Sequence, residues 1–318
     1  MQGCPSATGS DKDKLGKKPL ILNSKNNIIS IITTTSGNIN LIHFPAVRND
    51  NNKTVLCIHG SYSDARIFNY VGAQLSENGF NVYSMDLLGH GKSDGNIGDI
   101  NFNDCLSSIN EVIKKIRGSS QVYVLAHSIG CTFALWYVHD YKEHIDGLIL
   151  MAPYFRISTV KKRSVAEPNF FNFLYLFLRR LTTPKTLVKM TELFPELNDI
   201  GGEEISQMLQ DRGLNFYYSY RYIIDIIAFR NSRVKALTDI GMVPILILHG
   251  KKDLIFFSAV SEAFFKLLKN KYKEIKLFDC DHWFYDAVSY NYMQSKYPEE
   301  SRKQVIATID KWISTTKS

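Results

Sequence analysis

The chain has 318 residues, of which 45% are hydrophobic and 22% charged, a composition typical of globular proteins rather than disordered ones. Its net charge is +7, but no helix-turn-helix, RNP or zinc-finger pattern accompanies the basic residues, so we expect no nucleic-acid partner. No apolar run is long enough to span a bilayer, and residues 1–18 lack the apolar stretch of a signal peptide, which predicts a cytoplasmic protein.

Five cysteines are scattered along the chain without the CxxC spacing of a zinc or redox site: Cys4, Cys57, Cys105, Cys131 and Cys280. Three of them, Cys57, Cys131 and Cys280, lie in or beside predicted core segments. We therefore expect small buried thiols in a reducing compartment, with neither a disulfide framework nor a bound metal.

The N-terminal part predicts a tail followed by the edge of a sheet. Residues 1–20 are polar and predict a disordered tail. Residues 27–34 and 38–44 are rich in Ile and Thr and are joined by Ser36-Gly37, which predicts a β-hairpin. Beyond the next strand, Asp64 can cap a helix that runs to Glu77.

Buried strands then alternate with helices, which predicts βαβ units and a mostly parallel central sheet flanked by helices. The predicted strands are 54–58, 81–85, 122–126, 145–151, 244–250 and 274–278, and the predicted helices end at Glu77 or span 102–116, 131–141, 258–268 and 299–313. Between Pro153 and Val243 the pattern is helical and aromatic. We therefore predict an α/β core over 21–153 and 243–318, with a helical cap over 154–242 inserted after the sixth strand.

One stretch of the chain, residues 122–130, suggests chemistry. A β-branched strand leads into Ala126-x-Ser128-x-Gly130, and a helical pattern follows at once. A strained turn that lifts a serine out of a sheet brings the strand and helix backbones together, so the residues two before and two after the serine must be small. This pattern is typical of a nucleophile elbow, and the start of the helix favours negative charge near Ser128.

A nucleophilic serine needs a base, and the base needs a carboxylate that orients it. Asp253 and His282 each follow a predicted strand beyond the cap, so serine, aspartate and histidine occur in the chain order of an α/β-hydrolase triad. We prefer Asp253 as the acid because it ends a different strand, from which it can reach the far imidazole nitrogen. The rival carboxylates near His282 are Asp279, Asp281 and Asp286.

Two backbone N–H groups are expected to form an oxyanion hole. One belongs to Ile129, directly after the nucleophile, and the other to Ser61, in the loop after the first buried strand. A separate turn-rich loop, Asp86 to Ser93, has no derivable chemistry. We interpret it as structural, with Asp86 accepting hydrogen bonds from backbone N–H groups.

With these motifs in order, the chain resembles the monoacylglycerol lipase and serine aminopeptidase branch of the α/β-hydrolase superfamily. The resemblance covers about residues 28–313 and rests on His59-Gly60, the Asp86 to Ser93 loop, Ala126 to Gly130, His249-Gly250-x-x-Asp253 and His282. It implies the α/β-hydrolase fold and the hydrolysis, without a cofactor, of acyl esters of glycerol, lysophospholipids and other small esters. A few members act on thioesters or peptides.

The early cap is both aromatic and basic. Its apolar run, residues 170–178, precedes Arg179 and Arg180, and it can lie at an anionic membrane surface or bury its apolar side over the active site. Either arrangement favours a lipid-like ester, so we predict a serine hydrolase of monoacylglycerols or lysophospholipids. An acyl-thioesterase, a serine aminopeptidase and a ligand-binding protein with little turnover stay open. Acyl length and oligomeric state are not predicted.

Overall fold

The computed structural model describes residues 27–48, 51–61, 63–96, 98–141, 145–153, 157, 160, 170–193, 217–232, 238, 240–289 and 295–316. The predicted tail, residues 1–20, lies outside the described residues, and so does part of the predicted cap.

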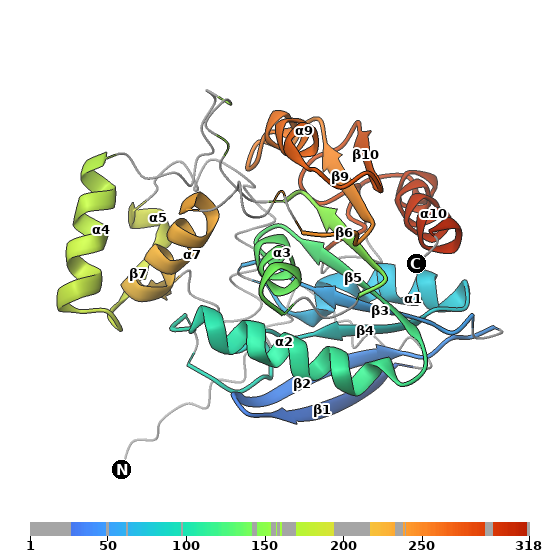
Figure 1. The fold of residues 1–318 in the computed structure, drawn as a ribbon, viewed down its shortest axis with the longest axis horizontal. Helices are drawn as coiled ribbons and strands as arrows, with labels where there is room; N and C mark the ends of the chain where they lie inside the picture. Colours follow the sequence, from blue (N-terminus) through green and yellow to red (C-terminus); the bar gives the residue numbers. More distant parts are fainter. Residues whose placement is uncertain are drawn as a thin grey trace, which may run out of the picture.

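An eight-stranded sheet runs through the middle of the molecule (Figure 1). Its strands are β1 (Ile28–Thr34), β2 (Gly37–Phe44), β3 (Lys53–Ile58), β4 (Asn81–Met85), β5 (Gln121–His127), β6 (Gly147–Met151), β9 (Ile245–Gly250) and β10 (Lys273–Phe278). They lie in the order β1-β2-β4-β3-β5-β6-β9-β10. Only β2 runs antiparallel to its neighbours, β1 and β4, while the strands from β4 to β10 pair in parallel. The predicted mostly parallel sheet is confirmed.

Helices cover both faces of the sheet. One face packs against α2 (Phe102–Arg117), α3 (Gly130–Tyr141) and α9 (Ser258–Leu267), and the other against α1 (Asn69–Glu77) and α10 (Glu299–Thr315). Along β3, Leu56 and Ile58 face the first layer while Val55 and Cys57 face the second. Burial on both faces explains the continuous apolar runs of the central strands. The four described cysteines are free and buried.

The described elements between β6 and β9 lie to one side of the sheet (Figure 1). The described elements there are α4 (Phe170–Thr182), β7 (Leu187–Lys189), α5 (Met190–Leu193), β8 (Tyr217–Ser219) and α7 (Tyr220–Ser232). The structure adds an antiparallel pair, β7 with β8, to a segment expected to be helical. Strands of three residues are too short to show a periodicity of two in the sequence.

The start of α7 is attached to the core at a loop that precedes α2. The Ser219 N–H donates to the Gly98 carbonyl at 2.7 Å, and Arg221 forms an ion pair with Asp99 at 2.9 Å. A Cβ atom on Gly98 would overlap the Tyr217 carbonyl oxygen, so only glycine permits this approach. The attachment holds β8 and α7 close to the sheet.

By contrast, α4 rests on α7. The contacts include an ion pair of 2.7 Å between Arg180 and Asp225 and a hydrogen bond of 3.0 Å between the Tyr175 and Tyr220 hydroxyls. Leu176 is the one buried residue of α4. Within the part of the chain that the structure describes, no helix combines the length and apolar character needed to cross a bilayer.

Candidate active site

Ser128 lies in the tight turn between β5 and α3. Its φ angle is 55°, a left-handed conformation that costs a non-glycine residue on the order of 1–3 kcal/mol. The surrounding structure holds this conformation, because the Ser128 N–H donates to the Met151 carbonyl at 2.9 Å. A Cβ atom on Gly130 would lie 2.5 Å from the Ile58 carbonyl oxygen, so the small residue expected there is required by close backbone approach. Ser128 directly follows the last residue of β5, and its side chain is half-buried.

The loop after β3 passes directly beside this serine. A Cβ atom on Gly60 would lie 2.9 Å from the Ser128 Cβ and 3.4 Å from its Oγ. Ser61, the next residue, and Ile129 are the two expected oxyanion donors. Among the described residues, neither of their backbone N–H groups donates a hydrogen bond to another carbonyl. Ile129 thus directly follows Ser128, and Ser61 lies in the loop that passes beside it.

His282 and Asp253 meet in the interior, although 29 positions separate them in the chain. The His282 Nδ1 lies 2.7 Å from the Asp253 Oδ2, and both side chains are buried. Because the carboxylate accepts, Nδ1 carries the proton and Nε2 is left as the basic nitrogen. The other carboxylate oxygen, Oδ1, accepts from the backbone N–H groups of Ile255 and Phe256 at 2.8 and 2.9 Å.

Two further histidines brace this pair. The His249 Nε2 donates to the Phe256 carbonyl at 2.7 Å and lies 3.3 Å from the Asp253 Oδ2. The His127 Nε2 donates to the His282 carbonyl at 3.0 Å, which links the residue before Ser128 to the backbone of the expected base. These contacts hold the loops that carry Asp253 and His282 in place.

The electrostatics favour an ionised aspartate. Burial by itself raises the pKa of Asp253, but the charge of His282 and the hydrogen bonds from His249 and His282 together lower that pKa well below its ordinary value. Asp253 therefore carries a negative charge at neutral pH. Such a charge can orient an imidazole and stabilise it when it gains a proton.

The rival carboxylates face other groups. Asp279 pairs with Lys252 at 2.9 Å at the surface, and the Asp281 Oδ2 accepts from the Tyr297 hydroxyl at 3.0 Å. Asp286 accepts from the Ser295 hydroxyl at 2.9 Å. Within the described residues, Asp253 is the carboxylate that contacts the His282 imidazole.

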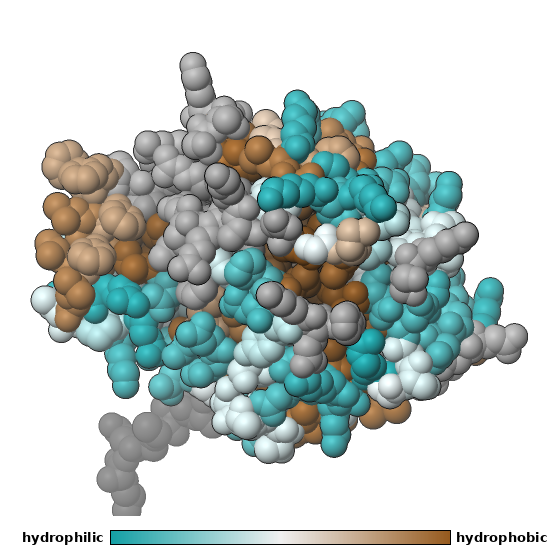
Figure 2. Space-filling view, in the orientation of Figure 1, coloured by the Kyte–Doolittle hydropathy of each residue, from teal (hydrophilic) through white to brown (hydrophobic). Residues whose placement is uncertain are grey.

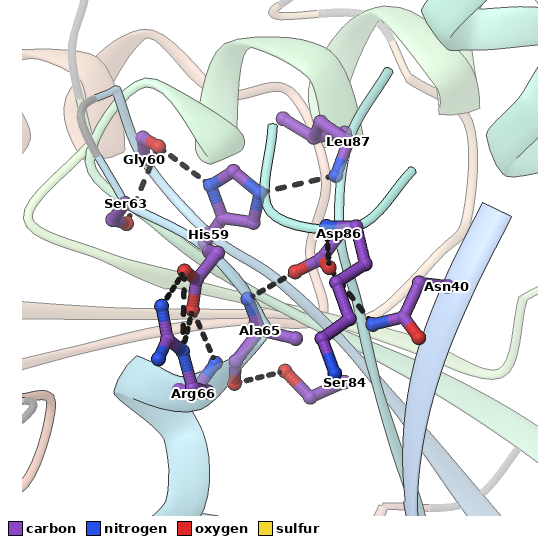
Figure 3. A network of polar contacts seen from close by, with 11 residues as sticks. Asn40, His59, Gly60, Ser63, Ala65, Arg66, Ser84, Asp86 and Leu87 are labelled. Atoms are coloured by element: carbon purple, nitrogen blue, oxygen red, sulfur yellow. Dashed lines mark hydrogen bonds and ion pairs between the residues drawn. The ribbon is translucent and has the colours of Figure 1, made fainter. Parts of the chain in front are cut away.

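The loop of Asp86 is structural, as we interpreted it (Figure 3). The Asp86 carboxylate accepts from the backbone N–H groups of Ala65 and Lys92 at 2.7 and 2.8 Å and from the Asn40 amide at 2.8 Å. Next to it, His59 donates from Nδ1 to the Gly60 carbonyl at 2.6 Å and accepts the Leu87 N–H at Nε2. This network fixes the loop that carries Ser61.

Two features of the site escaped the sequence. Phe284, Tyr285 and Asp286 form a left-handed turn just after His282, with φ angles of 55°, 59° and 60°. Tyr222, on α7, buries its hydroxyl near Ser61. The signal that could have pointed to it was the aromatic cluster around it in the sequence, in which Tyr218 lies in β8 and Tyr222 lies four residues later in α7.

We found no grouping of His, Cys, Asp or Glu that could hold a metal ion among the described residues. The arrangement of Ser128, His282 and Asp253 suits acyl transfer: a hydroxyl in a strained turn, a buried imidazole with an ionised carboxylate, and N–H groups near the hydroxyl.

Comparison with known proteins identifies a family and a fold. The model of a family described as serine aminopeptidase, S33, matches residues 49–281. The monoglyceride lipase homolog of Monkeypox virus is 24% identical over 267 residues, which cover 81% of this chain and 88% of that protein. The uncharacterized protein YnbC of Escherichia coli is 29% identical over 135 residues, a match that spans 39% of this chain and 23% of that protein.

Among solved structures, a soluble variant of monoglyceride lipase from Saccharomyces cerevisiae, in complex with a substrate analog, has a TM-score of 0.73. It is 18% identical, and the match covers 96% of this chain and 99% of that one. At this identity the likeness concerns the fold, and it confirms the architecture that we predicted.

Proposed function

The chain belongs to the serine aminopeptidase, S33, family of α/β-hydrolases, and from this premise we propose that it cleaves the carboxylic ester of a monoacylglycerol or a lysophospholipid. The observation that carries the proposal is the buried contact of 2.7 Å between His282 and Asp253, next to the strained turn at Ser128. The viral and yeast relatives, both named for monoglyceride lipase, support a lipid ester as the substrate.

In the first half of the proposed reaction, the Ser128 Oγ attacks the ester carbonyl carbon while the His282 Nε2 takes the hydroxyl proton. The carbonyl π electrons move to oxygen, and the backbone N–H groups of Ser61 and Ile129 stabilise the oxyanion. Removing one such donor typically costs about 2.7–4 kcal/mol in the transition state. Asp253 stabilises the imidazolium that forms.

The tetrahedral intermediate then collapses. The carbon–oxygen bond to the alcohol breaks, and His282 returns the proton to the leaving alkoxide, so a free alcohol departs and Ser128 stays acylated. A water molecule repeats the attack with His282 again as base. The fatty acid leaves, and the Ser128 hydroxyl regains its proton.

The exposed side of α4 supports contact with lipid. Phe170 and Phe171 are 72% and 77% exposed, and further large apolar side chains of α4 are exposed beside them, as the hydrophobic area over α4 in Figure 2 shows. Arg179 and Arg180 follow in the last turn, where they can meet anionic head groups. We propose that α4 lies on a membrane surface while the enzyme acts.

The test combines active-site labelling with a substrate panel. Wild type and Ser128→Ala are treated with a fluorophosphonate probe and assayed on monoacylglycerols, lysophospholipids, acyl-thioesters and aminoacyl amides. We expect labelling and hydrolysis in wild type and neither in Ser128→Ala, with kcat reduced on the order of 10⁶-fold.

The panel decides between substrate classes. Turnover of long-chain monoacylglycerols or lysophospholipids supports the proposal. Labelling with turnover of thioesters or aminoacyl amides alone would replace the ester substrate, and a folded wild type that is never labelled would favour a ligand-binding protein.

A further inference from the structure

The hydroxyl of Tyr222 is buried without a hydrogen-bond partner among the described residues. Tyr222 lies on α7, where the cap meets the core, and its side chain is 3% exposed. A hydroxyl removed from water without a partner destabilises the folded protein, so such groups in native structures call for an explanation. A bound ligand that supplies the missing partner is one.

The position of this hydroxyl is set by three neighbours. The Tyr222 ring stacks on the Tyr218 ring, with centroids 4.7 Å apart and planes at 25°. Cys105 of α2 also lies close enough to act on the phenol electrostatically. The Ser61 side chain lies near enough to stabilise the charged form of the phenol as a hydrogen-bond donor would, yet no hydrogen bond of full geometry joins it to the Tyr222 hydroxyl.

Ser61 connects Tyr222 to the reacting atoms. It follows Gly60, whose backbone passes so close to Ser128 that a Cβ there would lie 3.4 Å from the Ser128 Oγ. The Tyr222 hydroxyl is therefore beside the loop that borders the nucleophile. Burial raises the pKa of Tyr222 well above its ordinary value, so the phenol keeps its proton and can donate.

The proposed reaction leaves certain substrate atoms without protein partners. The carbonyl oxygen is met by the N–H groups of Ser61 and Ile129, and the leaving oxygen takes the proton from His282. An acyl chain has no polar atoms to offer. The remaining polar atoms of a glycerol ester are the free hydroxyls of its alcohol part.

We infer that Tyr222 is a specificity-determining residue whose hydroxyl hydrogen-bonds a free hydroxyl in the alcohol part of the substrate. The inference rests on the proposed ester hydrolysis. It assigns to α7 the selection of polyol esters over simple alkyl esters of the same acid. The unpartnered hydroxyl gains its hydrogen bond when such a substrate binds.

The test measures Tyr222→Phe on two esters of one fatty acid, the monoacylglycerol and the ethyl ester. Removing one neutral hydrogen bond should lower the ratio of their kcat/KM values about tenfold relative to wild type. Tyr123→Phe is the matched control, because Tyr123 also buries a hydroxyl with no partner in the described residues, but on the face of β5 that packs against Trp312. Its ratio should equal that of wild type.

Three outcomes would overturn the inference. An unchanged ratio of kcat/KM values in Tyr222→Phe would show that the hydroxyl makes no selective contact. An equal loss of kcat/KM on both esters would show that the hydroxyl acts on the ester group or on folding. A fall in Tyr123→Phe of the same size would make the effect unspecific. Wild type that is labelled at Ser128 but hydrolyses neither these two esters nor lysophospholipids would refute the proposed function itself, a result that the variants do not influence.

Discussion

The sheet and the cap bury their apolar residues in opposite ways. Every residue of β6 and of β9 is buried, whereas α4 buries one residue of thirteen and exposes most of its large apolar side chains. A sheet that positions Ser128, Asp253 and His282 must hold its atoms to a fraction of an ångström. The exposed phenylalanines of α4 do not pack in the protein interior, and they form an apolar surface that lipid can cover. The following predictions test this division.

The largest effect is expected from the core carboxylate. Asp253→Asn keeps the shape of the side chain but removes the charge that orients the His282 imidazole, so kcat should fall on the order of 10⁴-fold. Ester hydrolysis at saturating substrate measures it. Asp279→Asn is the control, because that carboxylate pairs with Lys252 at the surface and should leave kcat within about twofold of wild type. Equal losses in the two variants would argue against Asp253 as the orienting group.

The next effect tests close packing around the base. A Cβ atom on Gly250 would overlap the carbonyl oxygens of Cys280 and Asp281, so Gly250→Ala must displace the loop that carries His282. A displacement of about 1 Å can lower the rate on the order of 10²-fold. Gly241→Ala provides the control, because its Cβ would meet nothing within 4 Å although its φ is +73°. It should lose stability by about 1 kcal/mol and keep its kcat.

Lowering the pH should destabilise the core through its buried histidines, which the cap lacks. Burial lowers the pKa of His90 and of His127 to about 3, while an unfolded chain protonates histidine near 6.5. Between these values the unfolded state binds more protons. The free energy of unfolding should therefore fall as pH drops below 6.5, by about 1.4 kcal/mol per pH unit for each imidazole. Residues 154–242 contain no histidine, so the cap has no such titration.

Urea unfolding between pH 7 and pH 5 would measure this slope. In that range the depressed pKa of Asp253 contributes nothing, because even the unfolded carboxyl titrates near about 3.9. His90→Gln should remove the part of the slope that the buried His90 imidazole contributes. A slope that is the same in wild type and in His90→Gln would mean that this buried imidazole is not held neutral.

The smallest effect concerns the cap surface. The double change Phe170→Ser and Phe171→Ser should weaken binding to vesicles that contain anionic phospholipid about tenfold, because less apolar area enters the lipid. The melting temperature should stay within about a degree, since both rings are exposed. Ile29→Ser, at a 62% exposed position of β1, is the control and should bind as wild type. Vesicle sedimentation compares them, and equal binding by all three would contradict a role for α4.

Much of the core could be predicted because buried strands appear in the sequence as short continuous apolar runs. Strand β4 was expected over the residues it occupies, and the other sheet strands within two residues of their ends. Ser128, Asp253 and His282 could be grouped from the sequence because each comes soon after a predicted strand. Parallel strands end at the same edge of a sheet. The left-handed turn from Phe284 to Asp286 could not be predicted, since no glycine marks it and its φ angles depend on the packing around it.

The cap was predicted less well for a related reason. The pairing of β7 with β8 joins segments that are 27 residues apart, and each strand is too short to carry a pattern. The unpartnered hydroxyl of Tyr222 depends on side chains from α2, β8 and the loop after β3. No single stretch of sequence contains that information. The tail and parts of the cap, residues 161–169 and 194–216 among them, lie outside the described residues, so the predictions made for them stay predictions.

The attachment of α7 at Gly98 and Asp99, together with the support of α4 by α7, has a consequence for local unfolding. The protection of an amide hydrogen against exchange reports the free energy of the least costly opening that exposes it to solvent. Since α4 rests on α7 while α7 is attached to the core at Gly98 and Asp99, protection should rise in steps from α4 to α7 to β5. A lipid surface that holds α4 would then slow exchange first in the helix that it touches.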